Sequence, residues 1–116
     1  EAPAGSARVL ALRSGWSGRW GRGDSFEGYP AVPPELAGAI VRAGYTLVVL
    51  DTPGPDPAGA AELASHRIFA RAGVLVVENA CNLELLGPGV FDVAALPLPV
   101  RGADGAPVRA AAWLGG

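Results

Sequence analysis

The sequence predicts a mixed α/β domain with two main helices, and three observations support this. Two apolar runs of strand length, residues 45–50 and 74–77, each follow a segment with helical spacing and a glycine. Two later apolar runs, residues 90–98 and 107–114, flank a glycine-containing turn and predict a hairpin. Helices that alternate with buried strands, followed by a hairpin, indicate αβ units and hence an α/β fold.

The composition is that of a globular protein, since half of the 116 residues are hydrophobic and 17% are charged. The net charge is −2, and the nine basic residues are all arginines scattered along the chain. Nucleic acid is therefore not expected as a partner, and neither is a membrane. No apolar run approaches the ~20 residues that a membrane-spanning helix needs. The length of residues 1–116 suits a single domain or a half-domain.

One cysteine, Cys81, is present, so an internal disulfide is impossible. Residues 1–10 lack the basic region and the long apolar region of a signal peptide. Both observations favour a cytoplasmic location. The sequence starts at Glu1 and contains no methionine, which suggests a fragment, a processed product or a trimmed chain.

Residues 7–12 form the first apolar run of strand length, and the following residues 14–29 are rich in glycine and aromatic side chains. Trp16 and Trp20 lie in this stretch. It is either a surface loop held in place by its tryptophans or a lid over an apolar substrate pocket. In the second case, both tryptophans are candidates for the pocket wall.

A helix is expected over residues 35–43, because prolines precede it, a glutamate opens it and a glycine follows it. The strand over residues 45–50 is continuously apolar and should be buried on both faces. Asp51 ends this strand, and a turn with three prolines follows. Asp51 therefore lies where α/β sheets tend to place ligand sites, although it is equally an ordinary turn acid.

The only histidine, His66, lies in the second expected helix, residues 60–72, and Glu78 directly follows the apolar run 74–77. A helix and a strand that returns antiparallel to it can bring both side chains to the same end of the unit. Imidazole and carboxylate are ligand types that suit Zn²⁺, Mn²⁺ or Fe²⁺. The alternative is an ordinary, partly buried histidine, or one that pairs with Glu62 on the same helix face.

Four segments occur in the order VLALRSGW, YTLVVLDTPGPDP, ASHRIFARAGVLVVEN and ALPLPVRGADGAPVRA. From Arg8 onward the chain thereby resembles the C-terminal half of the cyclase family of metal-dependent hydrolases, of the kynurenine formamidase and isatin hydrolase type. The most specific parts are the DTP–DP turn, the spacing from His66 to Glu78 and the ending GADGAPVRA.

The resemblance implies a swivelling β/β/α fold with strands of both directions, and assembly into oligomers. It implies that His66 and Glu78 bind one divalent metal ion, zinc or manganese, and that Asp51 belongs to a turn that supports the site. The implied reaction is hydrolysis of an amide or lactam C–N bond in a small aromatic substrate. No catalytic residue is assigned.

The family's motif HxGTHxDxP, which supplies the remaining ligands, is absent from this sequence. Metal-assisted hydrolysis needs those further ligands and an open coordination position, so we expect this chain alone to be inactive or to bind metal weakly. Its expected partner is the missing N-terminal half or a complementary chain, in a homo- or hetero-oligomer. The competing interpretation is a non-catalytic structural or binding subunit derived from the same family.

Overall fold

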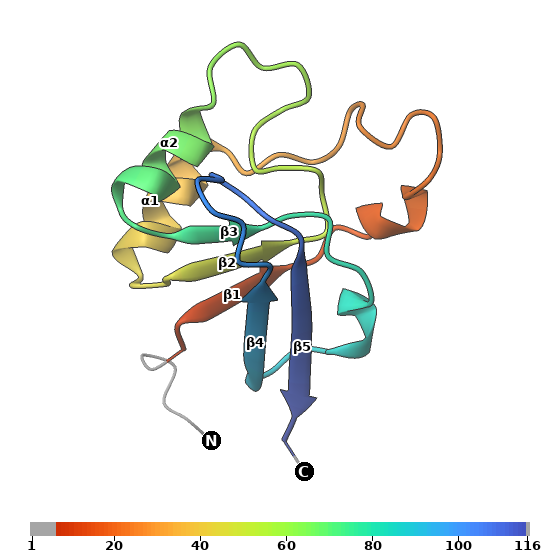
Figure 1. Ribbon diagram of the computed structural model, residues 1–116, viewed down its shortest axis with the longest axis vertical. Coiled ribbons are helices and arrows are strands. Elements are labelled where there is room, and N and C mark those ends of the chain that lie inside the picture. The colour runs from red at the N-terminus through yellow and green to blue at the C-terminus, as the bar shows by residue number, and fades with distance from the viewer. Residues whose placement is uncertain (1–6, 116) are drawn as a thin grey trace.

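A parallel sheet of three strands lies at the centre of the molecule, for which a computed structural model describes residues 7–115 (Figure 1). The spatial order of the strands is the same as their order in the sequence. They are β1 (Val9–Leu12), β2 (Leu47–Leu50) and β3 (Leu75–Val77). Parallel neighbours need a crossover connection, and each crossover here contains one α-helix.

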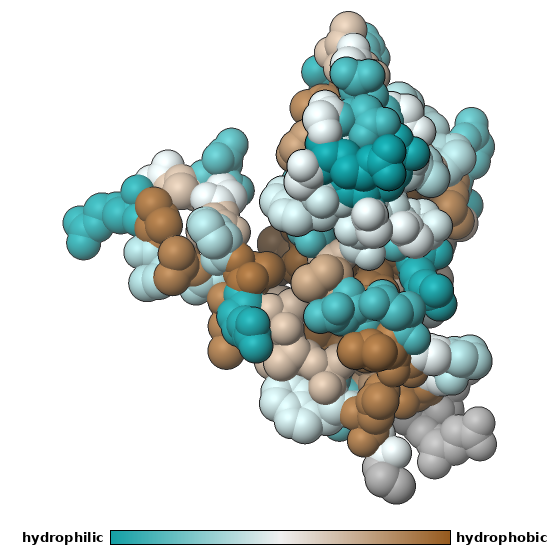
Figure 2. Space-filling model, turned by 90° about the vertical axis from the view of Figure 1, so that its right-hand side faces the viewer, coloured by the Kyte–Doolittle hydropathy of each residue, from teal (hydrophilic) through white to brown (hydrophobic). Residues whose placement is uncertain are grey.

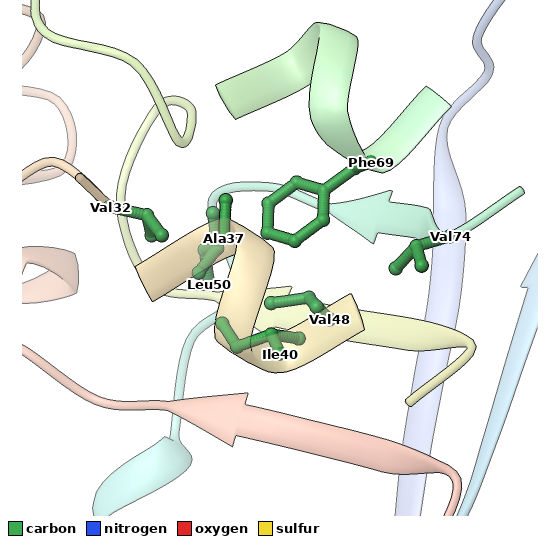
Figure 3. Packing of buried hydrophobic residues seen from close by; sticks show 7 residues of the cluster. All are labelled: Val32, Ala37, Ile40, Val48, Leu50, Phe69 and Val74. Carbon is green, nitrogen blue, oxygen red and sulfur yellow. The ribbon is translucent and has the colours of Figure 1, made fainter. Parts of the chain in front are cut away.

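The two crossover helices are α1 (Pro34–Arg42) and α2 (Ala64–Arg71), and they pack against each other. Side chains from both helices and from the sheet form one buried cluster (Figure 3). Its members are Val32, Ala37, Ile40, Val48, Leu50, Phe69 and Val74. The two helices therefore cover the same face of the sheet.

The other face of the sheet is covered by an antiparallel hairpin, which consists of β4 (Phe91–Pro97) and β5 (Val108–Leu114). Successive side chains of a strand point to opposite faces, so Val48 belongs to the helix side while Val49 lies in a second buried cluster. Val108 of the hairpin is partly buried and packs against that second cluster. In Figure 1 the hairpin strands run across the direction of the parallel strands.

The resulting layers are hairpin, parallel sheet and helices, which is the β/β/α arrangement that the family resemblance implies. Both strand directions are present, as predicted. They are divided between two sheets, because the hairpin pairs only with itself among the described residues.

Two local expectations were wrong. The strand over residues 74–77 was expected to be buried, but β3 is an edge strand and Leu75 is 70% exposed. The helix expected from residue 60 begins only at Ala64, so Glu62 lies outside it and is exposed. The cause of the later start is the carboxylate of Asp56, which accepts hydrogen bonds from backbone N–H groups at the start of α2.

Apolar side chains also reach the surface, and Figure 2 shows several on the face it presents. Large exposed apolar residues of the hairpin and its connection are Val90, Leu96, Leu98, Val100, Trp113 and Leu114. Within residues 7–115, no helix is both long and apolar enough to cross a membrane.

Candidate functional site

The candidate site lies where β2 and β3 end and α2 begins. Glu78 directly follows β3, and His66 lies in the first turn of α2. The two loops that leave β2 and β3 are joined by backbone hydrogen bonds, from Asn79 N–H to the Thr52 carbonyl and from Ala80 N–H to the Leu50 carbonyl, each 2.9 Å long. The sheet pairing thus continues beyond the strands and fixes the backbone that carries Glu78.

The side chains of His66 and Glu78 are in direct contact. His66 Nε2 lies 3.0 Å from Glu78 Oε1, although the two residues come from a helix and from the end of a strand. Both side chains remain accessible to solvent, at 39% for His66 and 36% for Glu78. The sequence-based expectation that the fold could bring these two side chains together agrees with this geometry.

The other ring nitrogen of His66 faces Asp56. Nδ1 lies 2.6 Å from Asp56 Oδ2, and an ionised carboxylate can only accept, so the ring nitrogen is the donor. The backbone N–H of His66 donates to the same oxygen at 3.0 Å, and the N–H of Ser65 donates to Asp56 Oδ1 at 2.7 Å. His66 is therefore positioned between two carboxylates, one buried and one exposed.

Burial alone would raise the pKa of Asp56, which is only 4% exposed. The backbone N–H groups of His66 and Ser65, together with the His66 ring, outweigh that effect and hold the pKa of Asp56 below its usual range. Asp56 is consequently an ionised acceptor at neutral pH. It supplies the negative charge that the first turn of α2 itself lacks.

Gly54 has no side chain, so the space in front of His66 and Glu78 stays open. A Cβ atom at this position would lie 3.4 Å from Glu78 Oε1, 3.5 Å from His66 Cε1 and 3.8 Å from the hydroxyl of Tyr29. The three side chains therefore converge on one point. Burial raises the pKa of the Tyr29 phenol, and the negative charges of Glu78 and Asp56 raise it further.

Asp51, expected in a turn that supports the site, does not contact His66 or Glu78. Its carboxylate accepts hydrogen bonds from Ser14 N–H, from the Ser14 hydroxyl and from Gly15 N–H, at 2.6 to 3.0 Å. Asp51 therefore joins the loop after β1 to the end of β2, which is the role of a structural turn acid.

Trp16 and Trp20 lie on the wall of a cavity of about 210 Å³ that also includes Asp51 and Asn79. Trp16 is fixed by its indole N–H, which donates to the Ser25 carbonyl at 2.8 Å. Trp20, by contrast, is 65% exposed. Because Asn79 follows Glu78 directly, this cavity adjoins the loop that carries the carboxylate.

A second cavity, of about 500 Å³, lies between the parallel sheet and the hairpin. Its wall is largely apolar and includes Val49, Val77 and Phe91, and Glu78 is on it as well. Asn79 and Cys81 line both cavities. The loop after β3 therefore borders both the cavity lined by the two tryptophans and the larger apolar cavity under the hairpin.

The contact between His66 and Glu78 fits two ligands of one metal ion. Zinc binds imidazole nitrogen at about 2.0–2.1 Å and carboxylate oxygen at about 2.0–2.2 Å, so neighbouring ligand atoms lie roughly 3 Å apart. The observed 3.0 Å is of this size. Among residues 7–115, however, no group of three or more His, Cys, Asp or Glu side chains could hold a metal ion.

Comparison with known proteins gives likenesses in sequence and in structure. The chain is 37% identical over 108 residues to the kynurenine formamidase of Geobacillus thermodenitrificans, which covers 92% of this chain and 49% of that protein. It is 37% identical over 82 residues to the kynurenine formamidase of Bordetella avium, over 71% of this chain and 39% of that one. No family model matches the chain.

Two solved structures share the fold. One is described as a potential metal-dependent hydrolase with cyclase activity, with a TM-score of 0.61 and 25% identity over 71% of this chain and 40% of that one. The other is described as a predicted metal-dependent hydrolase from Bacillus stearothermophilus, with a TM-score of 0.63 and 24% identity over 71% and 39%.

The layered fold and these likenesses define a β/β/α domain of the cyclase type. The chain belongs to the cyclase family of metal-dependent hydrolases, together with the kynurenine formamidases. It spans about half the length of the curated relatives it matches.

Sequence reasoning missed two residues of this site, Asp56 and Tyr29. The signal for Asp56 was present, since an aspartate between two prolines in a rigid turn offers a fixed acceptor. Its partner lies in another element, so periodicity alone gives no link between them. Tyr29 is the last residue of the glycine- and aromatic-rich loop, residues 14–29, and no local sequence pattern distinguishes it.

Proposed function

We propose that the complete protein is a metal-dependent hydrolase of arylformamidase type, to which this chain contributes the C-terminal half. It cleaves an amide or lactam C–N bond in a small aromatic substrate. The observation that carries the proposal is the 3.0 Å contact between His66 Nε2 and Glu78 Oε1, in a chain that is 37% identical to a kynurenine formamidase.

In this proposal His66 and Glu78 hold one divalent metal ion, zinc or manganese, and the remaining ligands come from outside the 116 residues. The bound ion supplies an activated water and polarises the scissile carbonyl. His66 binds through Nε2, because Nδ1 is occupied by its hydrogen bond to Asp56. Glu78 binds through the oxygen that now faces the imidazole.

The cavity lined by Trp16 and Trp20 is proposed as the place of the substrate's aromatic ring. Aromatic side chains offer large flat apolar surfaces, and edge or offset contacts with a ligand ring add to that burial. The support is geometric, since Asn79 lies on this cavity and next to Glu78 in the chain. Asp51 supports the cavity by fixing the backbone that precedes Trp16.

The partner is proposed to be the missing N-terminal half or a complementary chain that carries HxGTHxDxP. Residues 1–116 are then a half-domain, and the assembly is a homo- or hetero-oligomer in the cytoplasm. The exposed apolar residues of the hairpin and the 500 Å³ cavity beneath it support an incomplete core.

The test is reconstitution of the chain with a polypeptide that carries HxGTHxDxP, followed by measurement of zinc content and of aryl formamide hydrolysis. We expect both in the parent assembly. His66→Ala should lower hydrolysis more than ~100-fold and reduce zinc content, whereas Arg67→Ala, a change of the next and exposed residue, should do neither. Glu78→Gln should behave like the histidine variant.

A matched control for the second ligand is Glu62→Gln, because Glu62 is exposed and lies outside α2. Unchanged zinc content and hydrolysis in His66→Ala would contradict the site assignment. The alternative, a non-catalytic subunit, is favoured by the presence of only two candidate ligands in contact within residues 7–115. It predicts an assembly that forms but neither retains zinc nor hydrolyses the formamide.

A further inference from the structure

The carboxylate of Asp56 contacts both the backbone of α2 and the imidazole of His66. Three donors converge on it: His66 Nδ1 at 2.6 Å, His66 N–H at 3.0 Å and Ser65 N–H at 2.7 Å. The two backbone donors fix the carboxylate relative to the helix. Its position therefore does not depend on the ring that it also contacts.

The turn that carries Asp56 is itself fixed. Val32 N–H donates to the carbonyl of Pro55 at 2.7 Å, and the hydroxyl of Ser65 donates to the carbonyl of Val32 at 2.6 Å. These bonds connect the turn, the segment before α1 and the start of α2. Asp56 and Ser65 are both buried, at 4% and 0% exposure. The acceptor that faces His66 therefore belongs to a rigid part of the molecule.

An imidazole binds a metal ion only through an unprotonated nitrogen, and the partner of the other nitrogen decides which one that is. In this site the shorter contact is the one from Nδ1 to the buried carboxylate, and the longer one is from Nε2 to the exposed carboxylate. Because both ring nitrogens face a carboxylate, a neutral ring can donate to only one of them, and the shorter contact with the buried acceptor favours the proton on Nδ1. Nε2 of the neutral ring is then without a proton, and a metal ion beside Glu78 would take the place that a second ring proton occupies when the imidazole is charged.

We infer that Asp56 is a positioning residue, whose carboxylate holds the proton of His66 on Nδ1 and leaves Nε2 free to bind a metal ion beside Glu78. The inference rests on the proposed function, because a free Nε2 matters only if His66 binds a metal ion. The tautomer itself is a property of the metal-free chain and can be measured without activity. The competing role for Asp56 is that of a helix cap alone, which would leave the tautomer of His66 unaffected by its loss.

The experiment uses the fact that the chain has one histidine, so that nitrogen–proton correlation spectra show the ring of His66 alone. At a pH at which the spectrum shows a neutral ring, we expect the Nδ1–H tautomer in the parent. In Asp56→Ser we expect the Nε2–H tautomer, because the substitution removes the carboxylate that faces Nδ1. Titration with Zn²⁺ should show an apparent affinity ~10–100-fold weaker than in the parent.

Ser65→Ala is the matched control. It removes the buried 2.6 Å hydrogen bond to Val32 and so weakens the same end of α2, but it leaves the contact between Asp56 and His66 in place. We expect this variant to keep the Nδ1–H tautomer and a zinc affinity within ~3-fold of the parent.

An Nε2–H tautomer in the parent overturns the inference, and this spectrum decides the matter even if Asp56→Ser does not fold. Retention of the Nδ1–H tautomer in folded Asp56→Ser overturns it as well. Failure of the proposed function has a different signature. In that case the tautomers follow the expected pattern, but Zn²⁺ does not perturb the His66 ring in the chain or in the reconstituted assembly.

Discussion

Asp51 and Ser14 are 37 positions apart in the sequence and are joined through both the backbone and the side chain of the serine. Ser14 N–H lies 3.0 and 2.9 Å from the two carboxylate oxygens of Asp51, and the serine hydroxyl donates to one of them at 2.6 Å. The carboxylate is only 2% exposed. This contact joins the ends of two neighbouring parallel strands, β1 and β2. It lies at the start of residues 14–29, the loop rich in glycine and aromatic side chains.

Removal of this carboxylate should destabilise the fold. Asp51→Ala removes a buried carboxylate that accepts hydrogen bonds from the exposed residues Ser14 and Gly15. Hydrogen bonds to a charged group contribute about 1.5–3 kcal/mol, so we expect a loss of that size in the free energy of unfolding. Urea denaturation measures it. Asp104→Ala, at an exposed turn, should change that free energy by less than about 0.5 kcal/mol. Equal losses in the two variants would show that the hydrogen bonds of Asp51 contribute nothing.

Asp56 should make stability depend on pH in the acid range. Its pKa is lower in the folded chain than the ordinary value of 3.8, so the unfolded chain takes up the proton first as the pH falls. The stabilisation is complete above that ordinary value and is lost as the pH falls through the folded value. Between about pH 6 and pH 3, the unfolding free energy of the parent should therefore fall more steeply than that of Asp56→Asn.

The comparison for this pH series is Asp92→Asn, because Asp92 is exposed on β4. Its slope should match that of the parent. A slope in Asp56→Asn as steep as in the parent would mean that other groups account for the acid sensitivity.

Phe69 should be the most costly single truncation among the helix residues of the core. It is 1% exposed and lies between the helices and the sheet (Figure 3), so Phe69→Ala should lower the unfolding free energy by about 3–5 kcal/mol. Leu75→Ala removes an apolar side chain of β3 that is 70% exposed, and should cost less than about 0.5 kcal/mol. Both losses of unfolding free energy follow from denaturant midpoints, analysed with one shared dependence of that free energy on denaturant concentration.

The phenol of Tyr29 should report the charge of Glu78. Burial and the carboxylates of Glu78 and Asp56 raise the pKa of Tyr29, in that order of importance. Glu78→Gln removes one negative charge, so the pKa of Tyr29 should fall. Ultraviolet titration of the phenolate in a Tyr45→Phe background isolates Tyr29, because the chain has two tyrosines. An unchanged titration midpoint would place Glu78 too far from Tyr29 to influence it.

The sequence predicted the elements whose signals are local. Apolar runs bounded by glycine and proline indicated all five strands, and the antiparallel pairing of β4 with β5 is confirmed. The start of α2 was missed because it depends on Asp56, an acceptor in another segment. The exposure of Leu75 was missed because a continuous apolar run does not reveal that its strand lies at an edge.

The candidate site likewise contains contacts that the sequence indicated and contacts that it did not. His66 and Glu78 are conspicuous in the sequence as a lone histidine and a carboxylate after a strand, but spacing alone left an ordinary histidine as the alternative. The resemblance to the cyclase family is what favoured the pair as metal ligands. The second contact of His66 could not be predicted, since Glu62 is closer in helical spacing than Asp56 and only the turn geometry excludes it. The roles of Trp16 and Trp20 as a substrate wall stay predictions.

The backbone hydrogen bonds from Asn79 to Thr52 and from Ala80 to Leu50 have a consequence for selectivity. They fix the strand end that carries Glu78, while Asp56 fixes the helix end that carries His66. The gap between imidazole and carboxylate is thereby set when the chain folds, before any ion or substrate arrives. In the proposed metal site, such a gap would discriminate by size: ions whose bond lengths match it would bind without distortion, and larger ones would have to strain two hydrogen-bonded loops.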